Sequence, residues 1–160
     1  MSNSERLDVA RGKAQALWDK NSKRDAAIAS ERDKARDAET THGYRVTNEA
    51  VAGFCRGHEP RFIGLAGVDP HKGIRAVREL EFAIKELGLR GLNLHPYEHQ
   101  IPISDPKMYP LYAKCIELDI PLNLHCSTSF STAAEMDCGH PRHLDKVMMH
   151  FPELRVCAAP

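Results

Sequence analysis

From about residue 43 onward, the pattern of apolar and polar positions divides the chain into alternating short and long units. Four short apolar runs have the composition of buried strands: RFIGLAGV, LRGLNLHP, IPLNLHC and LRVCAA. Three longer segments separate them, and their apolar residues recur at helical spacing. In the first segment these residues are Ile74, Val77, Leu80, Ile84 and Leu87. The strands begin roughly 30 residues apart, the length of one strand–helix unit. This order predicts parallel strands joined by right-handed crossovers.

Capping residues and prolines mark where the helices begin. Thr47 or Asn48 is placed to cap a helix over TNEAVAGFCRGH. A later helix begins near Pro106 or, as the preference of proline for the first helical turn favours, near Pro110. Pro141 opens the last helix, and the segment YEHQIPISDP is expected to form a loop.

Two architectures fit this order: an open, flavodoxin-like doubly wound sheet and the (β/α)8 barrel. The tetrapeptide Leu-Asn-Leu-His occurs twice, at residues 92–95 and 122–125. Because side chains alternate along a strand, each copy places leucines on one face and Asn and His on the other. A polar face is unusual for a sheet that helices cover on both sides. It suits the interior of a barrel near its mouth, so we expect a partial TIM barrel of about four parallel strands.

Charged and polar side chains stand at the ends of three successive strands. Asp69, His95 and His125 each occupy the last strand position before a loop. A carboxylate and two imidazoles at the same barrel mouth are typical of a metal site or of acid–base catalysis. The alternatives are structural: a strand-end histidine is often held by hydrogen bonds, and Asp69 before Pro70 is typical of a turn.

Further polar residues lie beside these strand ends and are candidate substrate contacts. Asn93 and Asn123 share the faces of the two histidines, and Tyr97 follows in the loop above the mouth. Glu98 and His99 come next in that loop. We predict substrate-binding roles for Asn93, Tyr97 and Asn123.

Composition narrows the classes of function. The net charge is zero, which argues against a nucleic-acid partner, and no apolar stretch approaches the roughly 20 residues that cross a bilayer. Five cysteines without a CxxC spacing argue against a disulfide scaffold and favour a reducing, cytoplasmic setting. Residues 1–42 are rich in charged helix formers, so we expect a helical N-terminal segment before a barrel domain over residues 43–160.

The segments GLNLHP, YPLYAKCIELDIPLNLHCS and FPELRV resemble the amidohydrolase-related proteins (amidohydrolase family 2), within the aminocarboxymuconate-semialdehyde decarboxylase-like group. The resemblance implies a TIM-barrel enzyme with a divalent metal, most often zinc. It implies that His125 is the metal ligand at the end of the fifth barrel strand. His95 occupies the preceding strand end without matching a ligand, and we assign it a catalytic role.

The chain also departs from that family. It contains no His-x-His motif, which supplies the family's first-strand ligands, and Pro160 stands near the place of a sixth-strand histidine. We therefore expect a central piece of a longer barrel enzyme that binds no zinc and is inactive by itself.

The function expected for the complete enzyme is metal-dependent hydrolysis or nonoxidative decarboxylation of a small carboxylated or cyclic substrate. The alternative is a non-catalytic binding or regulatory protein that kept the βα scaffold and lost the metal site. A small doubly wound phosphate-binding domain has little support, since no GxGxxG or GxxxxGK[ST] follows a strand. The exposed edges of a partial barrel favour homo-oligomers.

Overall fold

The computed structural model describes residues 46–58, 61–126 and 135–159, all within one compact unit of the chain, residues 37–160. The helical segment expected over residues 1–42 lies outside the described residues.

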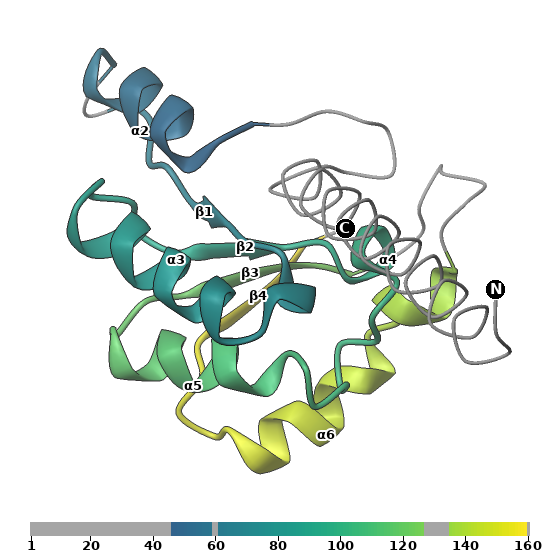
Figure 1. Ribbon diagram of the computed structural model, residues 1–160. Helices are drawn as coiled ribbons and strands as arrows, with labels where there is room; N and C mark the ends of the chain where they lie inside the picture. The colour runs from purple at the N-terminus through teal and green to yellow at the C-terminus, as the bar shows by residue number, and fades with distance from the viewer. Residues whose placement is uncertain (1–45, 59–60, 127–134, 160) are drawn as a thin grey trace, which may run out of the picture. The chain divides into compact units, whose positions relative to one another are not determined.

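Four parallel strands form one sheet (Figure 1). They are β1 (Ala66–Gly67), β2 (Leu92–Leu94), β3 (Leu122–His125) and β4 (Val156–Ala159). Their order in the sheet is β1-β2-β3-β4, and each pair is parallel. A doubly wound sheet reverses its strand order at a switch point, whereas a barrel adds each strand beside the previous one. The sequential order confirms the predicted α/β fold with part of a (β/α)8 barrel.

The helices alternate with the strands as the sequence pattern predicts. They are α2 (Asn48–Arg56), α3 (Ile74–Lys85), α4 (Pro96–His99), α5 (Tyr109–Glu117) and α6 (Arg142–His150), with 3-10 turns at Pro70–Lys72 and Met136–Gly139. Thr47 caps α2, because its hydroxyl accepts a hydrogen bond from the Ala50 amide. Pro110 lies in the first turn of α5, and Pro141 directly precedes α6.

The short helix α4 corrects the expectation of a loop over YEHQIPISDP. It begins with Pro96, whose fixed φ suits a first helical turn. It ends at His99 and is followed by Gln100, which has a left-handed backbone with φ of 54°. A helix of one turn has too few positions to show helical periodicity, so the pattern of apolar residues could not reveal it.

The hydrophobic core lies between the sheet and the helices α3 and α5, which run side by side along one face of the sheet in Figure 1. Leu92, Leu94, Leu122 and Leu124 have no solvent-exposed surface. On the opposite face the asparagines and histidines of the same strands are half-buried. The two faces of the strands therefore divide into a core side and a polar side, as alternation predicts.

The cysteines act as small apolar residues in this fold. All five are free thiols, and Cys115, Cys126 and Cys138 are buried. Burial raises the pKa of the Cys115 thiol to about 12, which keeps it protonated and unreactive. Among the described helices, none has the length and apolar character needed to pass through a bilayer.

Asn48 joins α2 to the sheet. Its side chain is 7% exposed and makes two hydrogen bonds with the main chain of β1. Asn48 Oδ1 accepts from the Gly67 amide at 2.9 Å, and Asn48 Nδ2 donates to the Gly67 carbonyl at 3.0 Å. The carboxamide thus pairs with the outer edge of β1 as a neighbouring strand would.

We predict that Asn48→Ala destabilises the fold by about 1–3 kcal/mol, because it leaves the partly buried N–H and C=O groups of Gly67 without their partner. Urea unfolding followed by circular dichroism measures this change. Glu49→Ala, at the adjacent exposed position of α2, is the matched control and should cost less than about 0.5 kcal/mol. Equal effects of the two substitutions would show that Asn48 does not hold the edge of β1.

Candidate functional site

The polar face of the sheet gathers its side chains at the carboxyl ends of β2 and β3. The parallel register places Asn93 directly beside Asn123, so His95 and His125 follow as neighbours. Their imidazole rings stack with centroids 5.2 Å apart and an interplanar angle of 15°. The ring of Tyr97, at the start of α4, meets the His125 ring edge-on at 5.1 Å. These five residues form one cluster, which we call the strand-end cluster.

Hydrogen bonds run through the strand-end cluster in one direction. Asn123 Nδ2 donates to Asn93 Oδ1 at 2.7 Å, and Asn93 Nδ2 lies 2.8 Å from His95 Nε2. Because an amide nitrogen donates, His95 Nε2 accepts and the ring proton sits on Nδ1. His95 Nδ1 then donates to the Tyr97 hydroxyl oxygen at 3.3 Å. The hydroxyl hydrogen of Tyr97 has no acceptor within the described residues and is available to a ligand.

Burial keeps His95 and Tyr97 uncharged at neutral pH. Removal from water lowers the pKa of His95, and the neighbouring His125 lowers it further. Burial also raises the pKa of Tyr97, with a contribution from the carboxylate of Glu98. At neutral pH the cluster therefore offers a neutral imidazole and a neutral phenol, which suit hydrogen-bond donation to a substrate oxygen.

A second polar cluster lies at the carboxyl end of β1. The carboxylate of Asp69, 3% exposed, accepts a hydrogen bond from the His71 amide at 2.9 Å. The same oxygen is 3.9 Å from His99 Nδ1 at the end of α4, and His71 Nε2 is 2.7 Å from the His99 carbonyl oxygen. Burial lowers the pKa of His99 to about 4, although the Asp69 carboxylate opposes this shift. Asp69 therefore forms the expected turn and also faces an imidazole.

The family resemblance implies a divalent metal, and the described residues meet that implication in part. The His125 ring has no hydrogen bond within them, so it can supply one ligand. A catalytic metal needs three protein ligands. Within residues 46–58, 61–126 and 135–159, no three His, Cys, Asp or Glu side chains are grouped to share an ion. These residues do not form a metal site by themselves.

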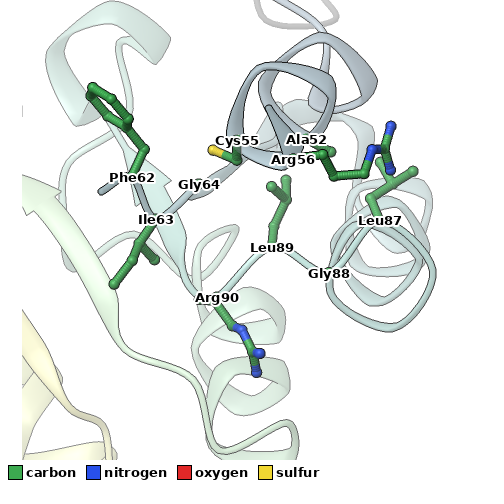
Figure 2. Close-up of a pocket in the computed structure, with 10 residues that line it drawn as sticks. All are labelled: Ala52, Cys55, Arg56, Phe62, Ile63, Gly64, Leu87, Gly88, Leu89 and Arg90. Carbon is green, nitrogen blue, oxygen red and sulfur yellow. The ribbon is translucent and has the colours of Figure 1, made fainter. Parts of the chain in front are cut away.

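A cavity of about 510 Å³ lies at the other end of the strands (Figure 2). It lies between α2 and the segment that leads into β2, and Gly64 and Leu89 contribute to its lining. Figure 2 shows the side chains of Arg56 and Arg90 pointing in different directions. The cavity therefore does not gather charge around one ligand, and active sites of barrels lie at the opposite, carboxyl ends of the strands.

The structure brings together Asn93, His95, Tyr97, Asn123 and His125, the residues that the sequence singles out. It places Asp69 with His99 instead, on the side of β1. The sequence missed His71, whose contact with the His99 carbonyl spans 28 residues. The sequence Asp69-Pro70-His71 was the available signal, because an aspartate that begins a turn accepts a hydrogen bond from the amide of the second residue after it, here His71.

Comparison with known proteins decides the family. The amidohydrolase family model (Amidohydro_2) matches residues 20–159. The chain belongs to this family. The resemblance predicted from the strand-end motifs is thereby confirmed, and all residues of the strand-end cluster lie within the matched region.

Three relatives illustrate the similarity. A 2-keto-4-carboxy-3-hexenedioate hydratase from Sphingobium sp. (strain NBRC 103272 / SYK-6) is 39% identical in an alignment of 64 residues, and the match covers 36% of this chain and 18% of the hydratase. An uncharacterised TIM-barrel protein from Bordetella bronchiseptica matches with a TM-score of 0.66 and 25% identity over 76% of this chain and 43% of its own. A 5-carboxyvanillate decarboxylase from Novosphingobium aromaticivorans, solved with bound manganese, matches with a TM-score of 0.57 and 21% identity over 68% of this chain and 36% of its own.

The match covers only part of the length of each of these relatives. The chain spans less than half the length of the Bordetella protein and about a fifth of the hydratase. The likeness to the decarboxylase, at 21% identity, shows the shared barrel fold.

The depressed pKa of His99 predicts a pH-dependent stability. Between the ordinary pKa of 6.5 and about 4, the unfolded chain binds a proton at His99 that the folded chain excludes. The free energy of unfolding should therefore be fully retained above pH 6.5 and decline toward pH 4, by on the order of 3 kcal/mol from this residue. Urea unfolding at several pH values measures the slope.

His99→Gln should flatten that slope, whereas His150→Gln, on an exposed histidine at the end of α6, should leave the His99 contribution in place. In an NMR titration, Asp69→Asn should lower the pKa of His99 further, because the opposing carboxylate is removed. Titration of His99 near 6.5 in the wild-type chain would contradict the buried, neutral imidazole.

Proposed function

We propose that the strand-end cluster is part of the active site of an amidohydrolase-family lyase that acts on a small carboxylated substrate. The observation that carries the proposal is the one-way series of hydrogen bonds from Asn123 to Tyr97, whose hydroxyl hydrogen has no acceptor among the residues that the structure describes. Such a chain fixes the orientation of a donor before a ligand arrives, which is how a site stabilises a substrate oxygen without reorganising.

The roles of the residues follow from their contacts. Tyr97 donates its hydroxyl hydrogen to a carboxylate or carbonyl oxygen of the substrate. His95 is the catalytic imidazole, and its Nδ1–H stabilises the negative charge that builds up on the Tyr97 oxygen as Tyr97 shares its hydrogen with the substrate. Asn93 and Asn123 fix the His95 tautomer and line the substrate side of the sheet.

The relatives support a carboxylated substrate. The hydratase and the decarboxylase named above both act on carboxylated compounds by their names, and both reactions are lyase reactions. A hydrolase on the same scaffold is the broader expectation from the sequence, and the reactions named for these relatives narrow the proposal to lyases.

His125 is proposed as one ligand of a divalent metal, zinc or manganese, in the complete site. Its support is the match to the fifth-strand ligand together with the ring's freedom from hydrogen bonds within the described residues. The bound metal would supply Lewis-acid polarisation of a substrate oxygen. The other ligands would come from outside the residues described here.

Ligand binding tests the role of Tyr97. We predict that 4-hydroxy-3-methoxy-5-nitrobenzoate, the compound bound in the manganese decarboxylase, shifts the NMR resonances of His95 and Tyr97 in this chain. Tyr97→Phe keeps the ring contacts but removes the donor, so the dissociation constant should rise about 5- to 15-fold, equivalent to a lost hydrogen bond.

The control is Tyr109→Phe, which makes the same change in a tyrosine packed against Phe151 rather than in the strand-end cluster. It should leave the dissociation constant unchanged. Equal affinities in the wild-type chain and Tyr97→Phe, or shifts confined to the cavity near Gly64, would contradict the proposed site.

Metal content is a separate prediction. Because the described residues supply one of the three ligands that a catalytic metal requires, the purified chain should carry far less than one zinc or manganese per molecule. Elemental analysis after growth in supplemented medium measures this ratio. One metal per chain that disappears in His125→Ala would instead show that this chain completes the metal site alone.

A further inference from the structure

The short helix α4 connects the two polar clusters at the carboxyl ends of the strands. Tyr97, its second residue, belongs to the strand-end cluster, and His99, its last residue, lies 3.9 Å from Asp69. Residues two positions apart on a helix are separated by about 200° around its axis, so the two side chains leave α4 in nearly opposite directions. A movement of α4 at the His99 side is therefore transmitted to Tyr97.

A helix as short as α4 depends on contacts from outside it. It has four residues, and a single helical turn is not stable by itself, because nucleating a helix is unfavourable. The carbonyl groups of the last turn of a helix also lack partners within the helix. The Pro96 and Tyr97 carbonyls accept main-chain bonds from the two residues that follow α4. The His99 carbonyl is bonded by a side chain instead, since His71 Nε2 lies 2.7 Å from its oxygen.

His71 is itself held by the turn that follows β1. Asp69 caps this 3-10 turn, because its carboxylate accepts a hydrogen bond from the His71 amide at 2.9 Å. At neutral pH His99 is uncharged, since burial lowers its pKa to about 4, so its contact with Asp69 is not an ion pair. The bond from the His71 imidazole to the His99 carbonyl is therefore the stronger of the two polar links between this turn and α4.

We propose that His71 is a positioning residue for Tyr97: its imidazole holds the His99 carbonyl and thereby fixes the rotation of α4 that places the Tyr97 hydroxyl. The inference rests on the proposed function of Tyr97 as a hydrogen-bond donor to the substrate. A rotation of α4 by about 10° about its own axis would move the end of a long side chain by roughly 1 Å.

Such a movement matters at Tyr97, because the hydrogen bond from His95 Nδ1 to its hydroxyl oxygen is 3.3 Å long. This length is near the limit for a hydrogen bond, so a further 1 Å or so would break it. Loss of the His71 bond should therefore misplace the Tyr97 hydroxyl, although no residue proposed to touch the substrate has been changed.

Ligand binding in a double-mutant cycle tests whether His71 acts through Tyr97. The dissociation constant of 4-hydroxy-3-methoxy-5-nitrobenzoate should rise about 3- to 10-fold in His71→Ala, and no more than in Tyr97→Phe. When Tyr97→Phe is already present, His71→Ala should change the constant by less than about twofold, because no donor is left to misplace. His71→Gln, whose amide N–H can reach the same carbonyl, should restore most of the wild-type affinity.

His58 supplies the matched control. It is an exposed histidine whose Nδ1 lies 2.8 Å from the Phe54 carbonyl oxygen, so it makes the same kind of contact with α2 that His71 makes with α4. His58→Ala should leave the dissociation constant unchanged. Because His71 is also exposed, His71→Ala should fold, and circular dichroism checks this for each variant.

NMR of the ligand-free chain provides a measurement that does not depend on the proposed function. With isotope-labelled tyrosine, His71→Ala should shift the ring resonances of Tyr97 and leave those of Tyr109 in place, and His71→Gln should return them. Wild-type affinity in Tyr97→Phe would overturn the proposed function, but shifted Tyr97 resonances in His71→Ala would still support the placement of Tyr97 by His71. Unshifted Tyr97 resonances in His71→Ala, or an equal loss of affinity with and without Tyr97→Phe, would overturn the inference.

Discussion

The alignment of two identical Leu-Asn-Leu-His strands is the constraint on which the rest of the structure depends. Because β2 and β3 are in register, leucine lies beside leucine on the core side, and asparagine lies beside asparagine on the other side. A slip of one residue would turn Asn93 and His95 into the core and expose two fully buried leucines. The cost of burying unpaired polar groups makes that slip unfavourable, and the same register brings Asn123 within hydrogen-bond distance of Asn93.

The repeat also explains how much of the site could be predicted from the sequence. Alternation along a strand needs no tertiary information, so the shared faces of Asn93, His95, Asn123 and His125 followed directly. The lengths of the strands could not be predicted in the same way. RFIGLAGV has the composition of an eight-residue strand, yet only Ala66–Gly67 pairs as one. The length of a strand depends on where its neighbour forms a ladder with it, which is a property of the assembled sheet rather than of the local sequence.

The Asp69–His99 pair shows a second limit of prediction. Asp69 before Pro70 indicates a turn, and its carboxylate does cap the following 3-10 turn. Nothing local places that carboxylate 3.9 Å from a histidine 30 positions later. Once the two meet, attraction to the carboxylate alone would raise the pKa of His99, but burial outweighs that attraction and lowers it. Which effect dominates depends on packing around α4, which the sequence did not predict as a helix.

The electrostatic character of the strand-end cluster bears on how a complete site would work. Asparagine, tyrosine and a buried, uncharged histidine can orient a carboxylate, but they do not neutralise its charge. Transfer of an anion into a partly buried site without a compensating cation is costly. The proposed site therefore needs a positive centre, and His125, whose ring stacks on His95 and has no hydrogen bond within the described residues, is the residue that would hold a metal ion there. In the proposed site, the uncharged hydrogen-bonded residues from Asn123 to Tyr97 would set the position of the substrate, and a cation would offset its charge.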